Sequence, residues 1–148
     1  SLCFSKGLGC PVGSVLIGSR EQIHEALRIR KVFGGGMRQA GYLAAAGSYA
    51  LKHHRKDLSL DHKRAKEIAE VLENCSFVHE IQPVTTNIII FSLKSDYDEV
   101  QFVQELKEKQ ILIIGLGKGK LRMVTHRDYT QEHHTYLLTT LSKMEVYA

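Results

Sequence analysis

The chain has 148 residues, of which 43% are hydrophobic and 24% charged, the composition of an ordinary globular protein. Its formal charge of +4 comes from basic residues spread along the chain rather than clustered with aromatic residues, which argues against a nucleic-acid partner. No apolar run approaches the roughly 18 residues of a membrane span, and three cysteines without CxxC spacing favour a reducing, cytoplasmic setting.

The first part of the chain predicts two short strands and two helices. Residues 1–5 read as a strand that ends in the glycine-rich turn SKGLGCPVG, and residues 15–17 read as a second strand. Ser19 and Gln22 form a capping box, which predicts a helix that ends at the triple glycine of residues 34–36. The next helix is rich in alanine and glycine, so we expect other elements to bury it. These elements have more apolar surface than they can cover themselves, which predicts one edge of a larger α/β layer.

A change to charged residues at positions 53–56 marks the predicted domain junction. Residues 1–52 then form one domain and residues 53–148 another. The second domain predicts the order helix, strand, strand, helix, strand, strand, helix, which is an α+β sandwich with a small sheet covered on one side by helices. Its strands are expected at residues 76–81, 87–93, 111–114 and 121–125, and its last helix from about Thr130.

Lys6 is the first candidate for chemistry, because it follows an apolar strand and stands among glycines. An amine must be neutral to attack a carbonyl carbon, and partial burial or nearby cations lower a lysine pKa from about 10.4. Glycines at positions 7, 9 and 13 let the backbone bend closely around a planar ligand. A lysine near glycines has no meaning alone, so the pattern needs support from other residues.

Arg38 lies after the triple glycine, where we expect it in the first turn of the second helix. Free backbone N–H groups and the positive end of the helix dipole suit a phosphate group at such a place. A flexible helix end with an exposed arginine is the alternative.

Arg122 lies inside an apolar strand, where it shares one face with Val124. Leu121, Met123 and Thr125 share the other face. An arginine in this setting needs an anion, and a carboxylate matches its bidentate geometry. The alternative is an arginine on an edge strand that faces the solvent.

Two other patterns predict no binding site. The adjacent histidines at positions 53–54 and 133–134 diverge by about 100° on a helix and are poor chelating pairs, so we predict no metal. The glycine- and lysine-rich residues 117–120 resemble a phosphate cradle but lack the full P-loop pattern and its following helix, which favours a hairpin turn.

Three motifs taken together resemble the low-specificity L-threonine aldolases: CFSKGLGCPVGSVLIGSREQI, RKVFGGGMRQAGYLAAAGSYAL and LRMVTHRDYT. These are pyridoxal-phosphate enzymes with the aspartate-aminotransferase fold (fold type I). The motifs follow the family's order and span nearly the whole chain, but they cover only its C-terminal part, from the cofactor lysine onward. The resemblance implies that residues 1–52 are the C-terminal edge of the large α/β, cofactor-binding domain, and that residues 53–148 are the small C-terminal α+β domain.

The resemblance also implies roles for four residues. Lys6 corresponds to the lysine that binds pyridoxal 5'-phosphate covalently. Arg38 corresponds to a contact of the cofactor phosphate, which we expect to be reached across a dimer interface, and Lys31 lines the same region. Arg122 corresponds to the arginine that holds the α-carboxylate of the amino-acid substrate.

The implied activity is cleavage of L-threonine or L-allo-threonine to glycine and an aldehyde. Such a lyase belongs to amino-acid metabolism and glycine biosynthesis, and we expect a cytoplasmic homodimer or homotetramer. The family's phosphate loop, its ring-stacking histidine and the aspartate of the ring nitrogen lie upstream. We therefore expect this chain alone to be inactive without the N-terminal part of the same protein. Another fold type I lyase or aminotransferase, and a non-catalytic α/β interaction fragment, remain alternatives.

Overall fold

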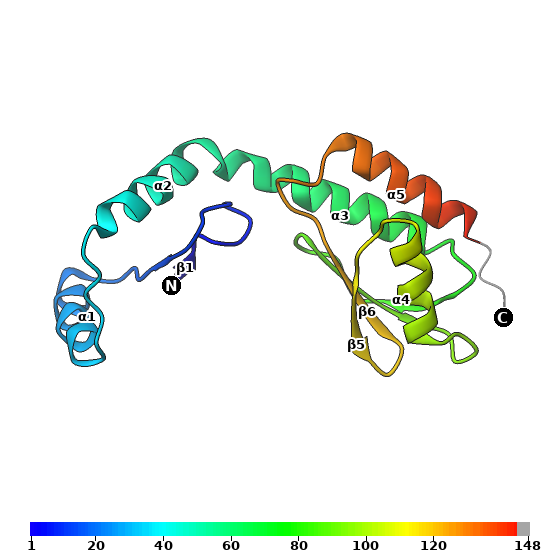
Figure 1. The fold of residues 1–148 in the computed structure, drawn as a ribbon, viewed down its shortest axis with the longest axis horizontal. Helices are drawn as coiled ribbons and strands as arrows, with labels where there is room; N and C mark the ends of the chain where they lie inside the picture. Colours follow the sequence, from blue (N-terminus) through cyan, green and yellow to red (C-terminus); the bar gives the residue numbers. More distant parts are fainter. Residues whose placement is uncertain (145–148) are drawn as a thin grey trace. The chain divides into compact units, whose positions relative to one another are not determined.

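The computed structural model describes residues 1–144. The chain divides into two compact units, Ser1–Lys56 and Asp57–Ala148, a boundary close to the predicted junction after residue 52 (Figure 1). Assigning these units to the large and small domains of an enzyme stays a prediction. Within residues 1–144, no helix combines the length and apolar character that crossing a membrane requires.

The first unit contains two short antiparallel strands and two helices, in the predicted order. Both strands are shorter than the apolar runs that predicted them. The capping box is confirmed, since the Ser19 hydroxyl accepts from the Gln22 N–H and the Gln22 side-chain oxygen accepts from the Ser19 N–H. The elements are β1 (Leu2–Cys3), β2 (Ser14–Val15), α1 (Arg20–Val32) and α2 (Ala40–His53).

Apolar side chains of this unit are widely exposed, as the sequence predicts. α1 buries none of its residues, and Phe33 at its end is 86% exposed. α2 buries Gly47 and Ala50, whereas Tyr42 is 84% exposed. The expectation that other elements bury α2 is therefore met along one narrow stripe of its surface.

The second unit has the predicted order of helices and strands. Its sheet has the strand order β3-β4-β6-β5, with every neighbouring pair antiparallel. A short 3-10 helix at Arg55–Asp57 directly precedes the first helix of this unit. The elements are α3 (Leu58–Leu72), β3 (Val78–Ile81), β4 (Ile88–Leu93), α4 (Glu99–Glu108), β5 (Ile114–Gly117), β6 (Lys120–Val124) and α5 (Gln131–Lys143).

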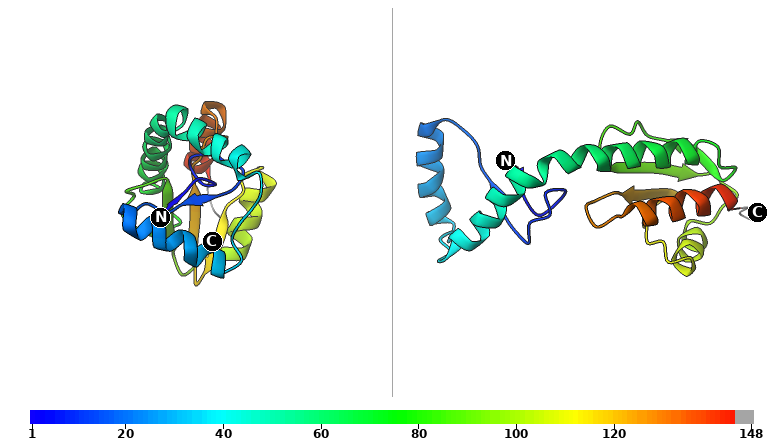
Figure 2. Two further views of the ribbon diagram at one scale, coloured as in Figure 1. Left: turned by 90° about the vertical axis from the view of Figure 1, so that its left-hand side faces the viewer. Right: turned by 90° about the horizontal axis from the view of Figure 1, so that it is seen from above.

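Alternate residues of the central strands form the core of this unit. Ile89 and Phe91 of β4 and Leu121 and Met123 of β6 are buried, while their neighbours along each strand are more exposed. The buried face packs against apolar residues of α3, α4 and α5, and Figure 2 shows α3 and α5 running side by side along the sheet. The predicted sheet with helices on one side is confirmed.

The position of β5 differs from the prediction. The apolar run at residues 111–114 predicts a strand, but the strand is Ile114–Gly117. Ile111 instead enters the core directly after Gln110, whose φ of 60° turns the chain. The hairpin predicted at the glycines is confirmed, because Lys118 and Gly119 have φ values of 57° and 71° between paired strands, typical of a type I′ turn.

Candidate functional site

Lys6 lies in a compact loop that closes on itself through backbone hydrogen bonds. The Gly9 N–H donates to the Lys6 carbonyl at 2.8 Å, and the Cys10 N–H donates to the Phe4 carbonyl at 3.0 Å. The Phe4 N–H donates to the Gly13 carbonyl at 2.9 Å. The Lys6 side chain is exposed, so the loop fixes the backbone on both sides of a free amine.

Two buried residues attach this loop to α2 and the residue that follows it. Leu8 is 5% exposed, and its carbonyl accepts a hydrogen bond from Nδ1 of His54 at 2.8 Å. The buried Cys10 thiol donates to the Ala46 carbonyl at 3.5 Å. The geometry holds the inner side of the loop against the helix and leaves Lys6 on the outer side.

The Cys3 thiol lies within electrostatic reach of Lys6. Its sulfur is 3.4 Å from the Ser5 hydroxyl, and this hydrogen bond is the main cause that lowers the pKa of Cys3 from its ordinary value of 9.0. The positive charge of Lys6 lowers it slightly further.

Lys31 and the triple glycine come together at the end of α1. A side chain at Gly36 would place its Cβ 2.7 Å from the Lys31 ammonium nitrogen, which lies at the end of a flexible side chain and can move aside. A Cβ at Gly35 would stand 2.5 Å from Cγ of Arg30, whose carbonyl accepts from the Gly35 N–H at 2.8 Å. Arg38 is exposed and precedes the start of α2 at Ala40, which corrects its predicted place in the first helical turn.

Arg122 lies on an interior strand of the sheet. β6 runs between β4 and β5, which places Arg122 opposite Ile90 on one side and Ile114 on the other. The edge-strand alternative is therefore wrong. Its side chain is on the sheet face opposite the helices, half-buried, and its Nε is buried without a hydrogen-bond partner among residues 1–144. A buried guanidinium N–H without an acceptor favours an anionic ligand.

The first unit thus carries Lys6, Lys31 and Arg38, and the second carries Arg122. The functional roles of all four stay predictions. Among the described residues, no group of three or more His, Cys, Asp or Glu side chains could hold a metal ion, and the absence of a metal stays a prediction.

A polar network between α3 and α5 is absent from the sequence predictions. His134 is 2% exposed, and its Nε2 lies 2.8 Å from a carboxylate oxygen of Glu67. Its Nδ1 is 3.1 Å from the Tyr129 hydroxyl, and burial raises the pKa of Tyr129 to about 12, so this hydroxyl stays protonated. Arg64 donates to the Tyr129 carbonyl. Glu67 and Arg64 of α3 are 67 and 65 residues away from their partners His134 and Tyr129, so no local motif in the sequence predicts these contacts.

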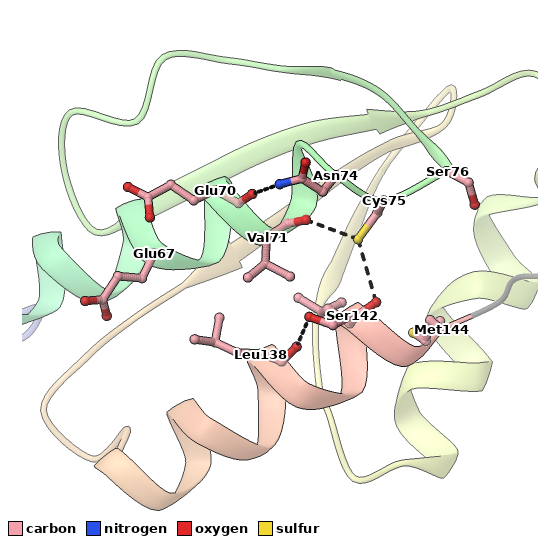
Figure 3. A pocket seen from close by; sticks show the side chains of 10 residues that line it. Glu67, Glu70, Val71, Asn74, Cys75, Ser76, Leu138, Ser142 and Met144 are labelled. Atoms are coloured by element: carbon pink, nitrogen blue, oxygen red, sulfur yellow. Dashed lines mark hydrogen bonds between the residues drawn. The ribbon is translucent and has the colours of Figure 1, made fainter.

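A pocket of about 520 Å³ lies between α3 and α5 (Figure 3). Cys75 lines it, and its thiol donates to the carbonyls of Val71 at 3.3 Å and Leu141 at 3.6 Å. Burial raises the pKa of the Cys75 thiol, so it stays protonated and unreactive. None of the predicted site residues lines this pocket, which separates it from the predicted chemistry.

The glycine-rich loop, its lysine and the helices that follow match a known family. The family model described as Beta-eliminating lyase matches residues 1–96, which is well over half of the chain. The chain belongs to the beta-eliminating lyase family.

Several relatives of this chain are named low-specificity L-threonine aldolases, the family that its motifs resemble. It is 38% identical over 141 residues to "Low-specificity L-threonine aldolase 1" of Arabidopsis thaliana, covering 93% of this chain and 39% of the relative. It is 40% identical over 132 residues to the "Low specificity L-threonine aldolase" of Escherichia coli strain K12, covering 89% and 38%. The resemblance is confirmed, and the chain spans about two fifths of the length of these relatives, in their C-terminal part.

Solved structures also agree with the fold predicted for this beta-eliminating lyase chain. A decarboxylase from Sulfurospirillum multivorans has a TM-score of 0.57 at 17% identity, covering 85% of this chain and 37% of that one. The ornithine aminotransferase of Toxoplasma gondii ME49 has a TM-score of 0.55 at 20% identity, covering 68% and 25%. Likeness at this identity concerns the fold alone, and it confirms the predicted fold type I class.

Proposed function

We propose that the protein carrying this chain is a pyridoxal-phosphate-dependent aldehyde-lyase that cleaves L-threonine and L-allo-threonine to glycine and an aldehyde. The relatives named low-specificity L-threonine aldolases support the reaction, because they share 38–40% of residues across most of the chain. Since the chain spans two fifths of their length, the activity of the whole protein belongs to this proposal.

We propose Lys6 as the residue that binds the cofactor. When bound, pyridoxal phosphate supplies an electron sink for the electron pair released as a Cα–Cβ bond breaks. The exposed amine of Lys6, on a loop fixed by Leu8 and Cys10, supports this role because it can reach a ligand without moving its backbone. Lys31 and the exposed Arg38 are proposed phosphate ligands, because both cations lie near the triple glycine of residues 34–36.

The single observation that carries the substrate assignment is the guanidinium of Arg122. Its Nε is buried without an acceptor among the described residues, on a face with apolar neighbours such as Ile90 and Ile114. A substrate α-carboxylate would satisfy this donor and fix the orientation of the amino acid. A neutral side chain at this position would leave the carboxylate in water and weaken substrate binding.

The remaining parts of the proposal concern the assembled protein. We propose that residues 1–52 form the C-terminal edge of the large domain and that residues 53–148 form the small domain. The assembled protein is proposed to be a cytoplasmic homodimer or homotetramer that contributes to glycine biosynthesis. The apolar exposure of α1 and α2 supports further chain or subunit contacts in the first unit. The chain alone is expected to lack activity.

The test is reduction of the purified full-length protein with borohydride in the presence of pyridoxal phosphate, followed by peptide mass mapping. The cofactor label is expected on the peptide that contains Lys6, and Lys6→Ala should abolish both label and release of glycine from threonine. Lys52→Ala, an exposed lysine on α2, is the matched control. Label on another lysine, or a keto acid as the product, would contradict the proposal.

A further inference from the structure

The glycine-rich hairpin between β5 and β6 binds an anion, and that anion is a side chain of the protein. One carboxylate oxygen of Glu99 accepts the Gly117 N–H at 3.0 Å, and the other accepts the Gly119 N–H at 2.8 Å. A side chain at Gly115 would overlap the same carboxylate. The pattern that resembles a phosphate cradle is thus a cradle for Glu99, at the first residue of α4.

The hairpin needs such an attachment because β5 is a weak strand. It lies at the edge of the sheet, its four residues are all exposed, and its pairing with β6 shifts register between Gly115 and Gly117. Glycine loses more backbone freedom on folding than other residues and adds no side chain to pack. Two charge-assisted hydrogen bonds to Glu99 oppose fraying of this strand.

The tip of the hairpin is fixed from two directions. The Gly119 N–H reaches Glu99 on α4, while the Gly119 carbonyl accepts the Leu93 N–H at the end of β4, at 2.9 Å. The Gly119 residue is therefore held between the helix start and the neighbouring strand. Lys120, which follows it, begins the strand that carries Arg122.

Arg122 depends on both of its neighbouring strands. Five residue pairs fix β6 against β4, including Arg122 opposite Ile90. On the other side of β6, Ile114 of β5 lies opposite Arg122. The position of β5 depends in turn on the hydrogen bond between its Gly117 N–H and Glu99. We propose that Glu99 is a positioning residue for Arg122: it holds β5 in register, so that Ile114 flanks the guanidinium side chain. This inference rests on the proposed function, in which Arg122 binds the substrate carboxylate.

The first measurement is hydrogen exchange by mass spectrometry on the full-length, cofactor-loaded protein. Glu99→Ala should speed exchange of amides in residues 113–121 by about tenfold, and Glu99→Gln, which keeps one acceptor oxygen, by less. The control is Glu108→Gln, on the same helix, where the exposed carboxylate accepts from Gln104 rather than from the hairpin. Unchanged exchange in Glu99→Ala would overturn the inference that Glu99 holds the hairpin in place.

The second measurement separates positioning from general stability. The Arg122 contact is the same in the ground and transition states, so Glu99→Ala should raise KM for threonine by about tenfold and leave kcat within about twofold. Glu99→Gln should fall between Glu99→Ala and the wild type. A fall in kcat without a rise in KM would overturn the inference. If Arg122→Leu itself leaves KM unchanged, the proposed function of Arg122 fails. If Arg122→Leu raises KM and Glu99→Ala does not, the positioning role alone fails.

Discussion

Gly47 of α2 packs closely against Phe4, which directly follows β1. It is buried, and a Cβ there would stand 3.1 Å from Cε2 of the Phe4 ring. Gly41 is on the same helix with no atom within 4 Å of its would-be Cβ. Gly47→Ala and Gly41→Ala are thus a matched pair, since both add one methyl group to α2 and one of them presses on Phe4.

The two variants should change stability in opposite directions. Alanine in place of helical glycine stabilises by about 0.5–1 kcal/mol, which applies to both positions. Inserting a methyl group into a tight contact costs about 1–3 kcal/mol, which applies to Gly47. We therefore expect a net loss of about 1 kcal/mol for Gly47→Ala and a small gain for Gly41→Ala.

Hydrogen exchange of the amides in residues 2–10 is the direct assay, because it measures local opening of the loop. A loss of about 1 kcal/mol corresponds to exchange about fivefold faster in Gly47→Ala. Exchange in Gly41→Ala should stay at the wild-type rate or slow. Equal protection of this segment in the two variants would refute the packing of Phe4 on Gly47.

Three further predictions concern single side chains. Burial raises the pKa of the Asp61 carboxyl above its ordinary value of 3.8, so the folded protein binds this proton more tightly than the unfolded chain. The resulting stability is fully present below pH 3.8 and is lost as the pH rises through the raised pKa of the folded state. Urea unfolding of Asp61→Asn should lack this loss, and the same pH dependence in both proteins would contradict the burial effect. Lys118 has a φ of 57° in the hairpin turn, so Lys118→Asn should stabilise by about 0.5–1 kcal/mol, measured as a shift of the urea midpoint, whereas a destabilised variant would speak against the type I′ geometry. His54→Ala removes the 2.8 Å hydrogen bond to the Leu8 carbonyl and should speed amide exchange in the Lys6 loop, and His53→Ala, at an exposed neighbouring ring, should not.

Local signals in the sequence account for most of the elements. The Ser19 capping box, the residues around Thr130 and the alternation in β4 and β6 each depend on near neighbours, and the structure confirms them. The alternation also separated Arg122 and Val124 from Leu121 and Met123, and the structure buries the second pair in the core. These features need no knowledge of the rest of the chain.

Pairing and long-range contacts are what the sequence could not provide. The apolar run before β5 suggests a strand, but Ile111 belongs to the core and the sheet continues through glycines that have low strand propensity. Glu99 and the hairpin are about twenty residues apart, and His134 and Glu67 are 67 apart. The roles of Lys6 and Arg122 came from the resemblance, because a cation beside glycines or inside a strand does not identify its ligand.

The bonds between Glu99 and the hairpin have a consequence for association between molecules. An edge strand with free N–H groups is a template on which a strand of another chain can add, and proteins commonly interrupt such edges. At the open side of β5, the Gly117 N–H already has an acceptor within the same molecule, as does the Gly119 N–H in the adjoining turn, and the register shift makes the strand irregular. The same carboxylate therefore protects this sheet edge against intermolecular strand addition, the first step toward aggregation.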